Sequence, residues 1–141
     1  MDGGMFIKSM ACALAWRDGR DSGVNAMLGI LHTVRNRAEH FLVGDWLGAV
    51  EFFDDECFTG VYPDIRDPEF QQVLQIVDSV YDGTRQDKLT NGANLYMRFF
   101  EGPAGGTLPM FSFPRTAQIG FIHFYNAPIT VDRRGIDHAH V

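Results

Sequence analysis

An apolar stripe between residues 26 and 41 constrains this chain more than any other feature. Such a stripe, with spacings of three, four and seven residues, places its side chains on one face of an α-helix. We therefore expect a helix that packs into a core, following Asp21 and Ser22, either of which can cap its first turn. The stripe consists of Ala26, Met27, Ile30, Leu31, Val34, Ala38 and Phe41.

Two other segments on either side of this stripe also have helical patterns. A helix over roughly 5–17 ends near Asp18 and Gly19, where charge and glycine interrupt the apolar pattern. A short helix over 45–53 begins with Asp45, a residue type that caps helices well.

A fourth helix and a short extended region complete the expected fold. Asp67 is a cap, Pro68 suits the first helical position, and Gly83 is a typical stop signal. The aromatic runs ANLYMRFF and FIHFYN then suit a small antiparallel pair of strands or extended loops. We therefore expect a mainly α (α+β) fold, with the extended region in the C-terminal third.

Length and charge limit the classes of protein to which the chain can belong. Its 141 residues suit a single domain over 1–141, and a net charge of −6 opposes binding to nucleic acid. The N-terminal sequence MDGGMFIKSM matches neither a secretion signal nor a membrane span, so we expect synthesis in the cytoplasm. Cys12 and Cys57 lack zinc-binding spacing, and the terminal DHAH lacks a third ligand, so no metal is expected.

Aspartate and glutamate side chains are the remaining candidates for catalytic groups. A carboxyl group in apolar or crowded surroundings can hold a proton near neutral pH and deliver it to a leaving oxygen. Asp18, Glu51 and Glu56 have aromatic or apolar neighbours, whereas Asp54 belongs to an FFDDE run typical of a solvated helix end. His123 lies in an aromatic run, where a core role and a catalytic role are both open. Residue spacing does not choose among the three acids.

Five short motifs follow one another along the chain: WRDGRDS at 16–22, VRNR at 34–37, CFT at 57–59, DKLTNGANLY at 87–96 and IGFIHFY at 119–125. This series resembles the spore-cortex-lytic, or SleB-type, family of cell-wall hydrolases. In that family, segments like WxEARGE, NR, QFS, GATHY and HxFY occur in the same order. The resemblance covers about residues 8–127 and leaves a tail at 128–141 that we expect to be mobile.

The resemblance implies a lysozyme-like fold with a groove for the peptidoglycan glycan strand. It also implies cleavage between N-acetylmuramic acid and N-acetylglucosamine by a lytic transglycosylase, without a cofactor. One carboxyl group protonates the glycosidic oxygen and then accepts the proton of the muramic acid 6-hydroxyl. The family's catalytic glutamate corresponds to Asp18. The resemblance further assigns substrate contacts to Phe58, Thr59, Tyr96 and Tyr125, and supporting roles to Asn36, Arg37 and His123.

The departures from the family pattern keep a second hypothesis open. Aspartate at position 18 is shorter than glutamate by about 1.5 Å, Cys57 replaces the usual glutamine, and Leu95 replaces the usual histidine. The alternative is a non-catalytic relative that binds peptidoglycan or serves as a virion structural module. The enzyme would reach the wall by phage-type lysis or within a virion. If Asp18 is catalytic, it should lie in an open groove with Tyr96 or Tyr125 within reach.

Overall fold

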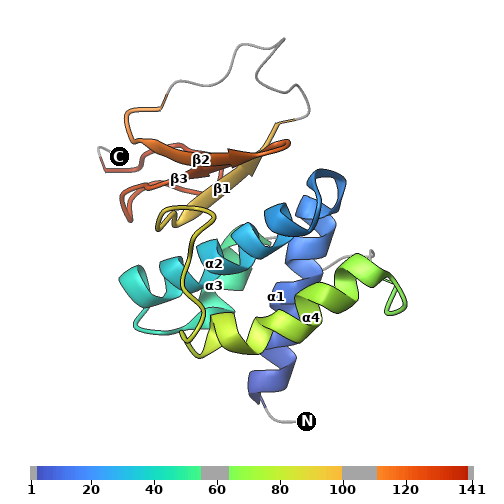
Figure 1. The fold of residues 1–141 in the computed structure, drawn as a ribbon. Coiled ribbons are helices and arrows are strands. Elements are labelled where there is room, and N and C mark those ends of the chain that lie inside the picture. Colours follow the sequence, from blue (N-terminus) through green and yellow to red (C-terminus); the bar gives the residue numbers. More distant parts are fainter. Residues whose placement is uncertain (1–2, 55–63, 100–110, 140–141) are drawn as a thin grey trace.

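Helices form one layer of the molecule and a small antiparallel sheet covers one side of them (Figure 1). The computed structural model describes residues 3–54, 64–99 and 111–139. The expected fold class, mainly helical with a small sheet near the C-terminus, is confirmed. The elements are α1 (Gly3–Gly19), a 3-10 turn (Arg20–Ser22), α2 (Val24–Phe41), α3 (Trp46–Phe53), α4 (Pro68–Tyr81), β1 (Leu95–Arg98), β2 (Arg115–Ile119) and β3 (Ile122–Tyr125).

The start and stop signals of α3 and α4 act as expected. The Asp67 carboxylate accepts hydrogen bonds from the amides of Glu69 and Phe70 at 2.8 and 3.2 Å. Asp45 accepts the amide of Gly48 in the same way at 3.0 Å. These bonds satisfy amides that have no partner within the helix, so local sequence fixes where both helices begin.

The start of α2 differs from the expectation. Gly23, with φ +92° and ψ 177°, precedes the helix, and no side chain caps it. The Ser22 hydroxyl instead accepts the amide of Phe121 at 2.9 Å, and Asp21 forms an ion pair with Arg98. The two predicted caps are therefore used in contacts with the sheet, and the left-handed glycine turns the chain into α2.

The sheet has the strand order β1-β3-β2, so the last strand lies in the middle. Tyr96 pairs with Phe124, and Met97 pairs with His123. Residues 95–98 and 122–125 fall inside the two predicted extended runs, but β2 was not predicted. Because successive side chains of a strand point to opposite faces, Tyr96 and Phe124 share one face of the sheet, and His123 lies on the other.

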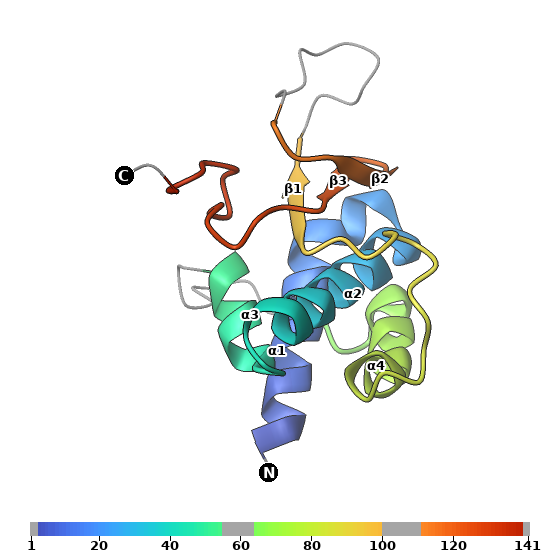
Figure 2. The same cartoon turned by 90° about the vertical axis from the view of Figure 1, so that its left-hand side faces the viewer.

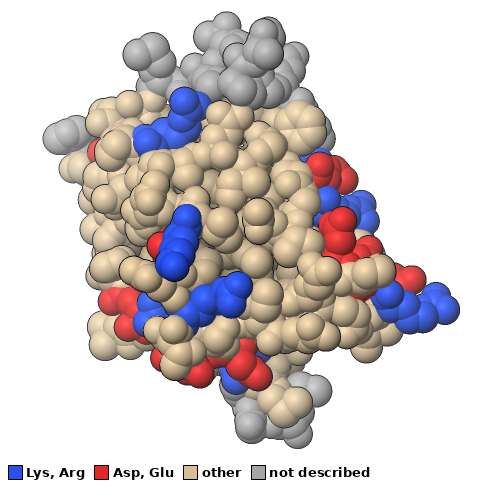
Figure 3. Space-filling view, in the orientation of Figure 1, with Lys and Arg blue, Asp and Glu red and all other residues tan. Residues whose placement is uncertain are grey.

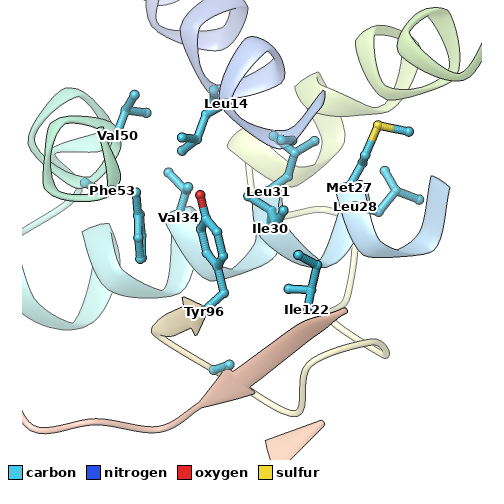
Figure 4. Packing of buried hydrophobic residues seen from close by; sticks show 14 of the residues in the cluster. Leu14, Met27, Leu28, Ile30, Leu31, Val34, Val50, Phe53, Tyr96 and Ile122 are labelled. Carbon is cyan, nitrogen blue, oxygen red and sulfur yellow. The ribbon is translucent and has the colours of Figure 1, made fainter. Parts of the chain in front are cut away.

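The core surrounds α2. Met27, Ile30, Leu31 and Val34 are fully buried between the other helices and the sheet (Figure 4). A Cβ atom on Gly29 would lie 2.6 Å from Cζ of Phe124, so the glycine permits the close approach of helix and sheet. The apolar stripe of α2 thus joins the two layers of the fold.

The C-terminal segment forms contacts within itself up to residue 139, and Val131 and Arg133 connect it to the rest of the protein. Val131 is 1% exposed and forms a bridge with Asp137. Asp132 binds Arg134 and His138 at 3.0 and 2.8 Å. The segment passes above α3 in Figure 2, where Arg133 Nη1 donates to the carbonyl of Phe53 at 3.4 Å.

The face in Figure 3 carries Lys and Arg side chains across its left half and charges of both signs along its right and lower edges, with an uncharged area between them. Within the described ranges, none of the helices has the length and apolar character needed to cross a membrane.

Cys12 is a buried free thiol, and burial raises its pKa to about 12.

Candidate functional site

Asp18 lies in the last turn of α1 and faces β1. Its side chain is 21% exposed. Arg17 Nε donates to Oδ1 at 3.0 Å, and Arg17 Nη2 donates to Oδ2 at 3.2 Å. The hydroxyl of Tyr96 also donates to Oδ2, at 2.5 Å. Both oxygens of the carboxylate are therefore held in a fixed orientation by groups from two different elements.

Tyr96 reaches Asp18 from the helix-facing side of the sheet. Figure 4 shows its hydroxyl pointing toward α1 beside Phe53. The two rings stack with centroids 4.6 Å apart and planes 28° from parallel. Burial raises the pKa of Tyr96, and the negative charge of Asp18 raises it further. The phenol therefore stays protonated at neutral pH and donates its hydrogen bond to the carboxylate.

Asp54 also belongs to the group of side chains around Asp18, although its FFDDE run predicted a solvated position. It follows α3, its side chain is only 2% exposed, and it accepts Arg17 Nη1 at 2.8 Å. Burial lowers the pKa of Arg17, but the hydrogen bonds to Asp18 and Asp54 outweigh that effect and raise it. Arg17 thus remains a cation between two carboxylates, and it links the end of α3 to the end of α1.

Asp18 opens onto a cleft of about 360 Å³. Arg98, Arg133 and Arg134 lie around it together with the rings of Phe53 and Phe99. Among the described residues that line the cleft, Asp18 carries the only carboxylate. The expectation that Asp18 lies in an open groove with Tyr96 within reach is met.

Tyr125 lies on the opposite face of the sheet from Asp18. Its ring contacts those of Phe111 and Phe113 edge to face, with centroids 5.1 and 5.7 Å away. It is 4% exposed and does not line the Asp18 cleft. Tyr125 therefore does not lie beside Asp18, because its side chain packs against Phe111 and Phe113; its contact with substrate stays a prediction.

His123 is also on this outer face, and it is fully buried. Its Nδ1 lies 3.2 Å from Arg115 Nη1, and its ring meets Phe99 edge to face at 5.0 Å. Burial lowers the pKa of His123, and the charge of Arg115 lowers it further, so the ring is neutral at pH 7. Since Phe99 lines the cleft, His123 supports the cleft wall from behind.

Asn36 and Arg37 hold the segment that enters β1. Asn36 Nδ2 donates to the carbonyl of Ala93 at 2.9 Å and to Asp87 at 3.1 Å. Arg37 Nη1 donates to the carbonyl of Asn94 at 3.2 Å. Burial lowers the pKa of Arg37 to about 10, which leaves it charged at neutral pH. Both residues therefore act on the cleft through the placement of β1 and do not line it.

The remaining candidates fall into two groups. Phe58 and Thr59 lie outside the described residues, as do Cys57 and Glu56. Glu51 is described and is exposed on α3. In the part of the chain that the structure describes, no three His, Cys, Asp or Glu side chains come together as metal ligands.

Comparisons of the chain with family models, with curated proteins and with solved structures found no match. Inference about function therefore depends on the groups gathered around Asp18. Of these, Asp18 and Tyr96 belong to two of the sequence motifs, and Arg17 and Asp54 provide the charged support behind them.

Proposed function

We propose that this protein cleaves the bond between N-acetylmuramic acid and N-acetylglucosamine in peptidoglycan, as a relative of the SleB-type hydrolases with a lysozyme-like fold. The observation that carries the proposal is the 2.5 Å hydrogen bond between Tyr96 and Asp18 at an open cleft. It joins residues 78 positions apart, from the two motifs to which the resemblance assigns the acid and a sugar contact.

The proposed reaction needs one carboxyl group. Protonated Asp18 gives its proton to the glycosidic oxygen as the bond from that oxygen to the muramic acid C1 breaks. The 6-hydroxyl of the same sugar then bonds to C1, and its proton returns to Asp18. The product carries a 1,6-anhydro ring, and the enzyme ends in its starting protonation state.

Tyr96 and Arg17 have a defined part in this cycle. The carboxylate that remains after proton donation accepts hydrogen bonds from both, as Asp18 does here. Preorganised donors stabilise charge that develops during reaction, and they need no rearrangement to do so. The same contacts aim the oxygen atoms, which matters because a misplacement of about 1 Å can cost roughly 100-fold in rate.

The cleft lining suits an acidic glycan. Arg98 and Arg134 already form ion pairs with aspartates, but a guanidinium group has further N–H donors. Together with Arg133 they can donate to the carboxylates of the peptide attached to muramic acid. The rings of Phe53 and Phe99 supply apolar surface for the faces of the sugars.

One observation favours the second candidate function, a non-catalytic module that binds peptidoglycan or serves in a virion. Both oxygens of Asp18 are already occupied by Arg17 and Tyr96. Aspartate also reaches less far than glutamate, by about 1.5 Å. A protein that has lost cleavage would keep the cleft and bind the glycan there without releasing products.

Cleavage of purified peptidoglycan separates the two functions. Zymograms and mass spectra of released muropeptides are recorded for the wild type, Asp18→Asn, Asp18→Glu and Tyr96→Phe. We expect anhydro products from the wild type, none from Asp18→Asn, and about tenfold less from Tyr96→Phe, which loses a hydrogen bond to a charged group. Asp64→Asn, at an exposed carboxylate outside the cleft, is the matched control and keeps full activity.

The other outcomes have clear meanings. Products from Asp18→Asn at the wild-type rate contradict the role of Asp18. If only Asp18→Glu clears peptidoglycan in the zymogram, the wild type has lost cleavage because aspartate is shorter than glutamate. Reducing ends in place of anhydro ends identify a hydrolase that uses water in the second step.

A further inference from the structure

A second cavity, of about 390 Å³, lies between α2 and the segment 85–89. It shares no lining residue with the Asp18 cleft. Leu28 and Leu89 provide its apolar surface, and five polar side chains provide the rest. These polar side chains are Asn25, His32, Arg85, Gln86 and Lys88.

The polar lining consists of hydrogen-bond donors, two of them cationic. Asn and Gln amides, imidazole, guanidinium and ammonium groups all donate. The described residues that line the cavity include no aspartate or glutamate, although the chain as a whole has a net charge of −6. The cavity is thus a local concentration of donors and positive charge on an acidic protein.

His32 is the most buried of these groups. It is 2% exposed, and among the described residues it has no hydrogen-bond partner. Burial lowers the pKa of His32. The negative charge of Asp87 raises this pKa in part, and the positive charges of Arg85 and Arg35 lower it further. The ring is therefore neutral, and one nitrogen carries a proton to donate. His32 lines the cavity, so its ring N–H can donate a hydrogen bond to a ligand there.

Arg85 and Lys88 also lack ion-pair partners in the part of the chain that the structure describes. The carboxylate of Asp87, between them in sequence, is engaged elsewhere: it accepts the amides of Leu89 and Thr90 at 3.0 and 2.9 Å. The two cations are thus not neutralised in the way that Asp54 and Asp18 neutralise Arg17.

We propose that this cavity binds the oxyanion group, phosphate or carboxylate, of a small molecule. Such a group accepts several hydrogen bonds at once, which matches donors that converge from α2 and from residues 85–89. The volume falls in the range of small-molecule sites, so the oxyanion belongs to a larger ligand. The proposal does not depend on cleavage at Asp18.

Amide and side-chain NMR spectra of the whole chain test the proposal. The protein is titrated with inorganic phosphate, with acetate, and with sodium chloride, all at one ionic strength. We expect saturable shifts at residues 85–89 and at the His32 ring with phosphate, with acetate, or with both. Shifts with phosphate alone identify a phosphate group as the ligand, and shifts with acetate identify a carboxylate. The proposal is overturned if phosphate and acetate change the chemical shifts no more than sodium chloride does.

Substitutions then show whether binding depends on the cavity. Arg85→Gln should weaken binding about tenfold, the loss expected for one hydrogen bond to a charged group. The matched control is Arg66→Gln, because the Arg66 side chain is 87% exposed and does not line the cavity. Equal losses in both variants would mean a general effect of charge and would refute the site. His32→Gln is measured together with its thermal midpoint, so that loss of binding is separated from loss of folding.

Discussion

Replacement of Asp87 by asparagine should destabilise the fold through the segment that leads into β1. Oδ1 of Asp87 accepts the amides of Leu89 and Thr90 at 3.0 and 2.9 Å. Oδ2 accepts the amide of Gly92 and Nδ2 of Asn36, both at 3.1 Å, and also the hydroxyl of Thr90. An asparagine amide keeps one acceptor oxygen and turns its NH₂ group toward donors, so at least two of these bonds are lost.

The size of the effect follows from the protonation equilibrium. Burial raises the pKa of Asp87, but the hydrogen bonds from Thr90, Leu89 and Gly92 outweigh this and lower it to about 2. Against the ordinary value of 3.8, this difference corresponds to about 2 kcal/mol in favour of the folded state when the group is ionised. We therefore expect Asp87→Asn to lower the free energy of unfolding by roughly 2 kcal/mol near neutral pH.

Urea unfolding at two pH values is the assay. Because the folded-state pKa is depressed, the stabilisation is present above the unfolded pKa and is lost as pH falls through about 2. The gap in stability between wild type and Asp87→Asn should therefore be full at about pH 6 and should narrow below about pH 3.5. A gap under about 0.5 kcal/mol at pH 6, or one that stays constant with pH, would refute the reasoning.

Asp82→Asn is the matched control. Asp82 accepts the amide and the hydroxyl of Thr84 at 2.9 and 2.7 Å, and these bonds lower its pKa. That carboxylate is fully exposed, so water replaces the lost bonds. Asp82→Asn should change the urea midpoint far less than Asp87→Asn does.

Two further substitutions test the contacts that join the elements. Asp54→Asn should cost about 2–3 kcal/mol in urea unfolding, because it breaks a buried ion pair, although Arg17 keeps its second carboxylate; a change under about 0.5 kcal/mol would contradict this. Gly29→Ala places a Cβ 2.6 Å from Phe124 and should lower the unfolding free energy by about 1–3 kcal/mol, seen as a lower thermal midpoint. An unchanged midpoint in Gly29→Ala would mean that helix and sheet separate without cost.

The helices could be predicted from the sequence because their signals are local. The capping residue Asp67, the proline after it and Gly83 define α4 within one continuous segment. The strand β2 has no such signal. Its sequence RTAQI has neither aromatic residues nor regular alternation, and it becomes a strand through pairing with β3.

The candidate site could be predicted only in part, since its contacts join distant segments. The resemblance predicted that Asp18 and Tyr96 lie in the same groove, and the two side chains form a hydrogen bond. It also assigned Tyr125 to the groove, although strand alternation places that ring on the other face of the sheet. Asp54 was missed because its burial depends on Arg17, which is 37 residues away in the chain.

The strand order has a consequence for synthesis on the ribosome. β1 holds Tyr96, and within the described ranges its only strand partner is β3, which ends at Tyr125. A nascent chain can form its four helices as they emerge, since their hydrogen bonds are local. The pairing of residues 95–98 with β3 cannot be completed until residue 125 has left the exit tunnel. The Asp18 cleft is therefore assembled late, after a period in which the helices exist and their sheet-facing side is uncovered.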